Sequence, residues 1–384
     1  MNPFILDEDH VEFRDNVRRF AREKLMPGYL ERAQRDEYPF EEVKQLGAAG
    51  LLGLCLPESL GGQGADLLAL GLACEEVSYA DINLGTILFG QGVPAALLAK
   101  YAPQTVIDRW VRGIVSGDVV HALALTEPGA GSDPQSMTCR AERVPGGWKL
   151  YGEKTSITQA PDAHVATVIA QTDRSLRAKG IGAFVVALDD PTVIRQRFRD
   201  PGARPVGRGS LTFEGTFVPD DHVAVEPGGG FQMVLHEFDL TRTLIALNVV
   251  GVAQRALDLA GAYALQRITF GQPIGVNQGV SFPIAEHNTY LAAIRSLAWH
   301  ALGLRMAGQP HTVQAAMLKW WAPQAAFAAI NDAIVLHGHV GWSEDMPLQA
   351  MLRDVSGYQI GDGTPQIQKL IIARELVHRT AAGR

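Results

Sequence analysis

The chain has 384 residues, of which 47% are hydrophobic and 20% are charged, and its formal net charge is −7. A chain of this size and composition can bury cores for two or three domains, which excludes a disordered protein and a small disulfide-stapled domain. The negative charge and the lack of a basic block argue against a nucleic-acid partner.

The three cysteines, Cys55, Cys74 and Cys139, are odd in number and lack CxxC or Cys/His spacing. The sequence therefore predicts neither a disulfide framework nor a metal site, and we expect a reducing, cytoplasmic compartment. The N-terminus, MNPFILDEDHVEF, carries acids where a secretory signal carries bases. No stretch approaches the roughly 18 apolar residues of a membrane span. We expect a soluble protein.

The first part of the chain is predicted to be helical. Over about residues 7–120 apolar residues recur at helical spacing, as at Phe13 and Val17, and this indicates an N-terminal helical domain at 1–120. The segment GGQG at 61–64 interrupts the pattern and is interpreted as a loop between two helices, without a catalytic role.

The middle and last parts differ in pattern. Short runs rich in Val, Ile, Thr and aromatic residues, separated by Gly and Pro, predict a β domain at 121–225 with an antiparallel sheet or small barrel. The segment PGGG at 227–230 is a flexible joint, and the chain then becomes helical again. Long helices are expected at about 231–266, 280–307, 312–337 and 364–381, within a C-terminal domain at 226–384. The fold class is therefore α+β.

Two motifs could carry chemistry. The loop TEPGAGSD at 126–133 has glycines that allow close backbone approach, and hydroxyls and amides that can bind a heterocycle or a phosphate, although such loops often only turn the chain. Near the C-terminus Asp362 stands between Gly361 and Gly363 at the start of a predicted helix. It could be a helix cap, or a base that faces a substrate lying against the glycines. The residues alone leave both interpretations, helix cap and base, open.

Four blocks of sequence resemble the acyl-CoA dehydrogenase family of flavoproteins, in order and at the family's spacing. They are LTEPGAGSD at 125–133, FDLTR at 238–242, QRITFGQPIGVNQ at 266–278 and RDVSGYQIGDGTPQIQKLIIARE at 353–375. The resemblance implies FAD as cofactor and an acyl-CoA dehydrogenase-like α+β fold. This fold has an N-terminal helical domain, a middle β-sandwich or barrel domain and a C-terminal four-helix bundle. It also implies a homotetramer or homodimer.

The resemblance assigns residues to FAD. The strand motif that follows the TEPGAGSD loop reads KTSITQ at 154–159, where Ser156 replaces the aromatic residue that commonly lies beside the flavin. In the family a neighbouring subunit holds part of the cofactor through an R-x-T-F-G motif and a following Gln. Val335 and His339 depart from a further adenine-binding segment. The residues expected at FAD are Leu125, Thr126, Ser132, Ser156, Thr158, Arg267, Thr269, Gln278, Thr364 and Gln366.

The resemblance also assigns the substrate site and the base. The residues expected at the substrate are Ser132, Asp239, Arg242 and Gly363. Thr241 occupies the position where one branch of the family carries its catalytic Glu, so the base is expected in the C-terminal loop. There Asp362 aligns with the Glu of the common branch and is shorter by one methylene, roughly 1.5 Å.

The shorter base suggests a compact substrate. An α-carbon that lies closer to the loop fits a cyclic, branched or short acyl group, as in the cyclohexane- and cyclohexene-carboxyl-CoA dehydrogenases. Asp362 would take the α-proton while hydride passes to flavin N5, giving a 2-enoyl thioester. The expected partners are an acyl-CoA or acyl-carrier-protein thioester and an acceptor such as an electron-transfer flavoprotein. A nitroalkane-oxidase-type oxidase with the same Asp and a non-catalytic flavin-binding relative are the alternatives.

Overall fold

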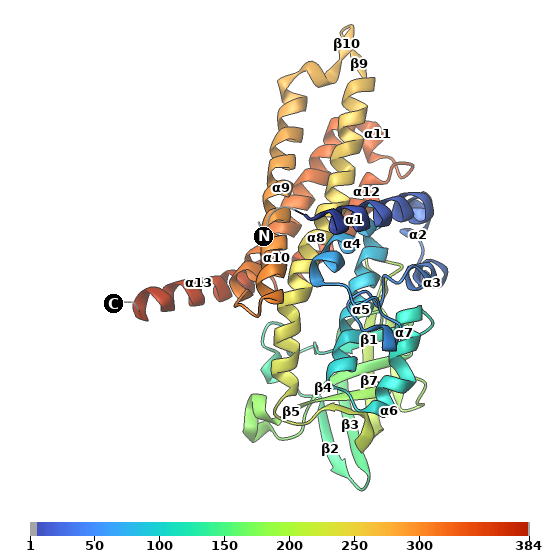
Figure 1. Ribbon diagram of the computed structural model, residues 1–384, viewed down its shortest axis with the longest axis vertical. Coiled ribbons are helices and arrows are strands. Elements are labelled where there is room, and N and C mark those ends of the chain that lie inside the picture. The colour runs from blue at the N-terminus through green and yellow to red at the C-terminus, as the bar shows by residue number, and fades with distance from the viewer. Residues whose placement is uncertain (1–5, 383–384) are drawn as a thin grey trace.

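The computed structural model describes residues 6–382 (Figure 1). Residues 1–5 and 383–384, which belong to the predicted terminal domains and include the start of the acidic N-terminus, lie outside the described residues. The first part of the chain is helical, as expected. Its α-helices are α1 (Glu8–Phe20), α2 (Tyr29–Arg32), α3 (Phe40–Ala48), α4 (Leu67–Ala80), α5 (Ile82–Tyr101), α6 (Gln104–Val106) and α7 (Arg112–Ser116).

The sheet follows these helices. Its strands are β1 (His121–Ala124), β2 (Arg140–Val144), β3 (Gly147–Thr158), β4 (Val165–Gln171), β5 (Ile181–Ala187), β6 (Val193–Arg197), β7 (Arg208–Pro219) and β8 (Val223–Val225). They are ordered β6-β7-β3-β2-β4-β5-β8, and β1 pairs with β4. The β1–β4 pair is parallel, so the expected antiparallel sheet is in fact mixed. Two strands, β2 and β3, come between β1 and β4 in the sequence. The chain reverses from β2 to β3 and reverses again from β3 to β4, so β4 runs in the same direction as β2 and β1.

The last part of the chain is again helical. It contains α8 (Gly230–Gln266), the short hairpin β9 (Ile268–Thr269) and β10 (Gln272–Pro273), α9 (Gln278–Met306), α10 (Thr312–His337), α11 (His339–Trp342), α12 (Leu348–Ser356) and α13 (Pro365–Ala382). The four long helices agree with the prediction. Helices α8, α9 and α10 pack lengthwise, whereas α13 packs against α10 and projects to the side (Figure 1).

Helix α8 connects the sheet to the far end of the helical part. It has 37 residues and is therefore about 55 Å long at a rise of 1.5 Å per residue. At its start, a Cβ on Gly230 would lie 2.8 Å from the carbonyl carbon of Gly182 in β5, so glycine permits the close contact with the sheet. At its other end the β9–β10 hairpin follows directly (Figure 1).

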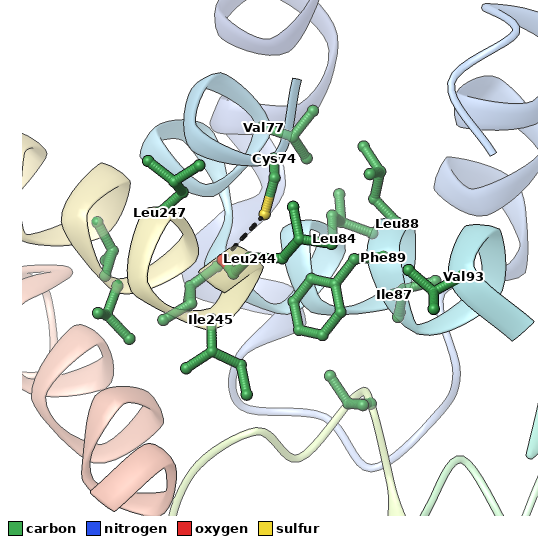
Figure 2. Packing of buried hydrophobic residues seen from close by; sticks show 14 of the residues in the cluster. Cys74, Val77, Leu84, Ile87, Leu88, Phe89, Val93, Leu244, Ile245 and Leu247 are labelled. Carbon is green, nitrogen blue, oxygen red and sulfur yellow. Dashed lines mark hydrogen bonds between the residues drawn. The ribbon is translucent and has the colours of Figure 1, made fainter. Parts of the chain in front are cut away.

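The main core lies where α4, α5 and α8 meet. Figure 2 shows Cys74 and Val77 of α4, Leu84, Ile87, Leu88, Phe89 and Val93 of α5, and Leu244, Ile245 and Leu247 of α8. The Cys74 thiol donates to the Leu244 carbonyl oxygen at 3.5 Å. A Cβ on Gly251 would lie 2.3 Å from the Glu75 carbonyl oxygen, so this glycine lets α8 approach α4 closely. The core thus fixes α8 against the N-terminal helices.

Two helices, Ile82–Tyr101 and Gly230–Gln266, are long and apolar enough to cross a membrane, judged by length and composition alone. In each of them 72% of the apolar window is buried inside the protein. The sequence analysis expected no stretch that approaches a membrane span, and these two helices differ from that expectation. Their burial in the core accounts for their apolar composition.

The three cysteines are free thiols. Burial raises the pKa of Cys55 to about 12 and that of Cys139 to about 11, so both thiols are protonated at neutral pH. Within residues 6–382 no cluster of three or more His, Cys, Asp or Glu side chains could hold a metal ion.

Candidate active site

Asp362 lies in the segment 357–364, which joins α12 to α13 and is called the base loop below. Asp362 has φ 53° and Gly363 has φ 96°, so the chain turns through two successive left-handed residues. Asp tolerates this conformation better than most residues, and Gly adopts it freely. The turn presents the half-buried Asp362 side chain toward α8.

The Asp362 carboxylate is held by Thr241. The Thr241 hydroxyl donates to Asp362 Oδ2 at 3.0 Å, across 121 positions of sequence. Among the described residues no N–H of α13 donates to the carboxylate, so the geometry does not support the helix-cap reading. Thr241 and Asp362, the two positions to which the resemblance assigns the base in different branches of the family, therefore face each other in this chain.

Side chains from two helices bind the backbone of the base loop. The Arg242 Nε on α8 donates to the Asp362 carbonyl oxygen at 3.3 Å. The amide Nε2 of Gln368, on α13, donates to the Asp362 carbonyl oxygen at 3.0 Å and to the Gly363 carbonyl oxygen at 3.2 Å. Both carbonyl groups therefore point into the protein. The sequence reasoning did not single out Gln368.

The N–H groups of the same loop are free. In the described part of the chain the backbone N–H groups of Asp362, Gly363 and Thr364 have no acceptor. A trans peptide places its N–H opposite its C=O, so the N–H groups of Gly363 and Thr364 point away from the helices that bind the carbonyls. Successive N–H groups of this kind form a concavity that can stabilise a negatively charged oxygen.

Asp239 and Arg242, which the resemblance assigns to CoA, are buried and paired. The Arg242 guanidinium lies 3.1 Å from Asp239 Oδ1, and the Thr312 hydroxyl donates to Asp239 Oδ2 at 2.6 Å. The Arg242 side chain is only 8% exposed, and the Asp239 side chain is only 11% exposed. The structure thus places this pair beneath the base loop, where Arg242 supports the Asp362 backbone.

A second cluster joins the TEPGAGSD loop to β3. The Thr155 N–H donates to the Thr126 carbonyl oxygen at 2.8 Å. The buried Lys154 ammonium donates to the Leu125 carbonyl oxygen and to Glu127 Oε1, both at 2.8 Å. The Glu127 carboxylate also accepts from both the N–H and the hydroxyl of Thr138. Burial would raise the pKa of Glu127, but Lys154 and Thr138 outweigh this effect and lower it. The Lys154–Glu127 pair thus holds the TEPGAGSD loop against β3.

The outer side of this cluster is open and polar. Ser132, Ser156 and Thr158 are exposed, Thr126 is half-buried and Leu125 is buried. A Cβ added to Gly129 or Gly131 would meet nothing within 4 Å, so there is free space over the loop. These hydroxyls, with backbone groups of the loop, fit the polar edge of a flavin ring.

Arg208 and the loop before β7 connect the two clusters. The Arg208 guanidinium donates to the Ser156 hydroxyl at 3.0 Å and pairs with Asp200. Three residues further along, the Ala203 N–H donates to Asp354 on α12 at 2.7 Å, just before the base loop. The segment 200–208, which the sequence motifs did not indicate, thus connects Ser156 of β3 to Asp354 of α12, the helix that precedes the base loop.

The remaining predicted FAD residues fall into two groups. Thr364 and Gln366 lie at the start of α13, beside Asp362. Arg267, Thr269 and Gln278 lie at the β9–β10 hairpin, at the opposite end of α8 from the sheet (Figure 1). Because α8 is about 55 Å long, one chain does not bring this second group to the residues at 126–158.

Comparisons with known proteins agree with this geometry. Residues 7–118, 122–216 and 228–377 match the N-terminal, middle and C-terminal domains of acyl-CoA dehydrogenases. The mitochondrial short-chain specific acyl-CoA dehydrogenase of Homo sapiens is 35% identical over 374 residues, which cover 97% of this chain and 91% of that protein. An acyl-CoA dehydrogenase of Bacillus subtilis (strain 168) is 34% identical, with 97% and 99% coverage.

Solved structures give the same result. Butyryl-CoA dehydrogenase from Megasphaera elsdenii is 28% identical with a TM-score of 0.92, over 97% of this chain and 99% of that one. A chain solved in work on the electron transferring flavoprotein of Acidaminococcus fermentans is 30% identical with a TM-score of 0.93 and the same coverage. PigA, solved with FAD and proline, is 26% identical with a TM-score of 0.94, over 98% and 99% of the two chains. The resemblance, the fold class and the FAD cofactor are confirmed, and the chain belongs to the acyl-CoA dehydrogenase family of FAD-dependent oxidoreductases.

Proposed function

We propose that the protein dehydrogenates a short, cyclic or branched acyl-CoA thioester to the 2-enoyl thioester, with Asp362 as the base. The contact between Thr241 and Asp362 carries this proposal. Thr241 occupies Oδ2, and Oδ1 has no hydrogen-bond partner among the described residues, so Oδ1 is the oxygen available for the α-proton. Bound FAD supplies the hydride acceptor.

The backbone of the base loop supports the same chemistry. Loss of the α-proton develops negative charge on the thioester oxygen, which needs donors held in advance. The unpaired N–H groups of Asp362, Gly363 and Thr364 are candidates, because Arg242 and Gln368 already hold the carbonyls on the other side. The loop would therefore bind the thioester and orient its α-carbon toward the carboxylate.

The preference for a compact acyl group rests on size and packing. Asp362 is one methylene shorter than the usual Glu, so its carboxylate reaches less far into the site. From Thr241 the same face of α8 continues with the buried residues Ile245 and Asn248. Ile245 belongs to the same buried core cluster as Phe89 of α5 (Figure 2). The short-chain and butyryl-CoA enzymes among the relatives, and the proline complex of PigA, also support small or ring-shaped substrates.

The test is anaerobic reduction of the bound flavin by a panel of thioesters. We expect butyryl-, isobutyryl- and cyclohexane-carboxyl-CoA to bleach the flavin absorbance at least tenfold faster than palmitoyl-CoA. A matched set on acyl carrier protein distinguishes the two carriers, and an electron transferring flavoprotein is the acceptor that we propose for turnover. Faster bleaching by a nitroalkane than by every thioester would instead identify an oxidase, and bleaching by none would identify a non-catalytic relative.

We further propose that each FAD site is completed by a second copy of the chain. The hairpin residues Arg267, Thr269 and Gln278 lie too far along α8 to serve the cofactor of their own chain. An Arg fork suits the pyrophosphate of FAD. Near this hairpin large apolar side chains are exposed, as expected of a surface that packs against another copy. They are Leu265, Ile268, Phe270, Val276 and Phe282.

Complementation tests this sharing. Arg267→Ala is expected to lower the FAD content at least tenfold, whereas Asp362→Asn keeps FAD but loses the base. When the two variants are co-expressed with different tags and the hybrid is purified, about half of its sites would combine Asp362 of one chain with Arg267 of the other. The hybrid should then recover up to half of the wild-type flavin-reduction amplitude. A hybrid as inactive as its parents would show that the site is built within one chain.

A further inference from the structure

Lys319 is a buried cation next to the base loop. It lies on α10 within the apolar run AAMLKWW and is 1% exposed. Its ammonium group donates to the Tyr358 carbonyl oxygen at 2.7 Å and to the Gly363 carbonyl oxygen at 3.3 Å. Within the described residues no carboxylate lies within ion-pair distance of it. A single ammonium thus joins the two ends of the base loop.

Such a group is costly to bury. An ammonium removed from water loses its hydration, which two carbonyl groups only partly replace. Burial accordingly lowers the pKa of Lys319 to about 8, while Asp362 opposes this shift and the neighbouring Arg242 adds to it. Strongly perturbed buried groups of this kind gather at functional sites. Lys319 thus contacts the loop backbone and is close enough to Asp362 for the two groups to interact electrostatically.

We propose that Lys319 is a positioning residue for Asp362: it clamps the base loop through the Tyr358 and Gly363 carbonyl oxygens and so holds the Asp362 side chain in place. This inference rests on the proposed function in assigning Asp362 as the base. The clamp fixes the peptide that follows Asp362, and with it the direction of the unpaired N–H groups.

The environment of Lys319 distinguishes this role from ordinary packing. The ionisable groups that act on it are Asp362 in the base loop and Arg242 on α8. Arg242 is already neutralised by Asp239, at 3.1 Å. Of the two groups that act on Lys319, Asp362 is the acidic one, and it precedes Gly363, whose carbonyl oxygen Lys319 binds. A methionine at position 319 would fill the same volume but supply neither the donors nor the charge.

The experiment compares FAD-loaded wild type, Lys319→Met and Lys319→Arg in the native assembly. For Lys319→Met we expect about a 10²-fold lower rate constant for flavin reduction, as for a displacement of about 1 Å at the reacting atoms. The FAD content should stay at the wild-type level, and amide hydrogen exchange of Ile360 and Gly361, whose N–H groups donate to the Gly357 carbonyl oxygen, should become faster. Lys319→Arg, which keeps a donor for the loop carbonyls, should recover most of the rate constant.

The matched control is Lys369→Met. Lys369 is exposed on α13, one residue after Gln368, and its ammonium lies over the Trp320 ring at 4.5 Å. It should behave as wild type in all three measurements. A Lys319→Met enzyme with an unchanged rate constant and unchanged exchange would overturn the proposal, whatever its stability. If no thioester reduces the wild-type flavin, the proposed function has failed, and the exchange of Ile360 and Gly361 alone then decides whether the clamp exists.

Discussion

Replacing Asp362 with Asn is expected to lower the rate constant for flavin reduction by an acyl thioester by about 10²–10⁴-fold, the usual contribution of a positioned general base. Asn keeps the size of the side chain and an oxygen that can accept from Thr241, so the loop and the FAD content should be preserved. Stopped-flow absorbance under anaerobic conditions measures the rate constant, and the absorbance of protein-bound flavin measures the cofactor content.

Two matched variants make the result specific. Thr241→Val removes only the hydroxyl that donates to Oδ2, and we expect roughly a tenfold loss, because the base remains but is less well oriented. Asp362→Glu restores the methylene of the common branch, and the preference should move toward straight-chain thioesters. If Asp362→Asn reduces its flavin at the wild-type rate, the base lies elsewhere and the assignment is wrong.

Replacing Lys154 with Met is expected to cost about 3–5 kcal/mol of unfolding free energy, because it leaves the Glu127 carboxylate buried without its cation. The side chains of Lys154 and Glu127 are 0% and 2% exposed, so water cannot replace the lost partner. The TEPGAGSD loop would also lose the bond to the Leu125 carbonyl oxygen, and with it the position of the flavin-side hydroxyls. Urea denaturation measures the first effect and bound FAD per chain the second.

A surface lysine on the same strand provides the control. Lys149 is exposed on β3, and Lys149→Met should change the unfolding free energy by no more than about 0.5 kcal/mol. The double variant Lys154→Met with Glu127→Gln should recover part of the loss, since it removes the uncompensated charge. If Lys154→Met unfolds at the wild-type urea midpoint and keeps its FAD, the pair does not hold the loop.

Much of the fold could be predicted because its signals are local. The long helices after residue 230 follow from helical periodicity, and the strands from short β-branched runs between glycines and prolines. The parallel pairing of β1 with β4 could not be read in this way. It depends on which distant strand β1 meets, and the register His121–Val165 has no local signature.

The candidate site likewise combines features that have a local sequence signal with features that do not. From the sequence, Asp362 between two glycines was equally consistent with a helix cap and with a base. In the structure its contact with Thr241, which is far away in sequence, distinguishes the two interpretations. Lys319 was not singled out from the sequence, where it is the one charged residue of the apolar run AAMLKWW. Its place in such a run was the available signal, because a lysine is almost never fully buried unless it is paired. Its partners are main-chain carbonyls, which leave no trace in the sequence.

The length of α8 has a consequence for how the protein behaves in dilute solution. If FAD is held between the sheet of one copy and the hairpin of another, as we propose, it is bound only as long as the copies stay together. Cofactor retention and association are then coupled by mass action, so each should strengthen the other. Flavin would dissociate as the chain is diluted, and added FAD would hold the assembly together at concentrations where the empty chains separate.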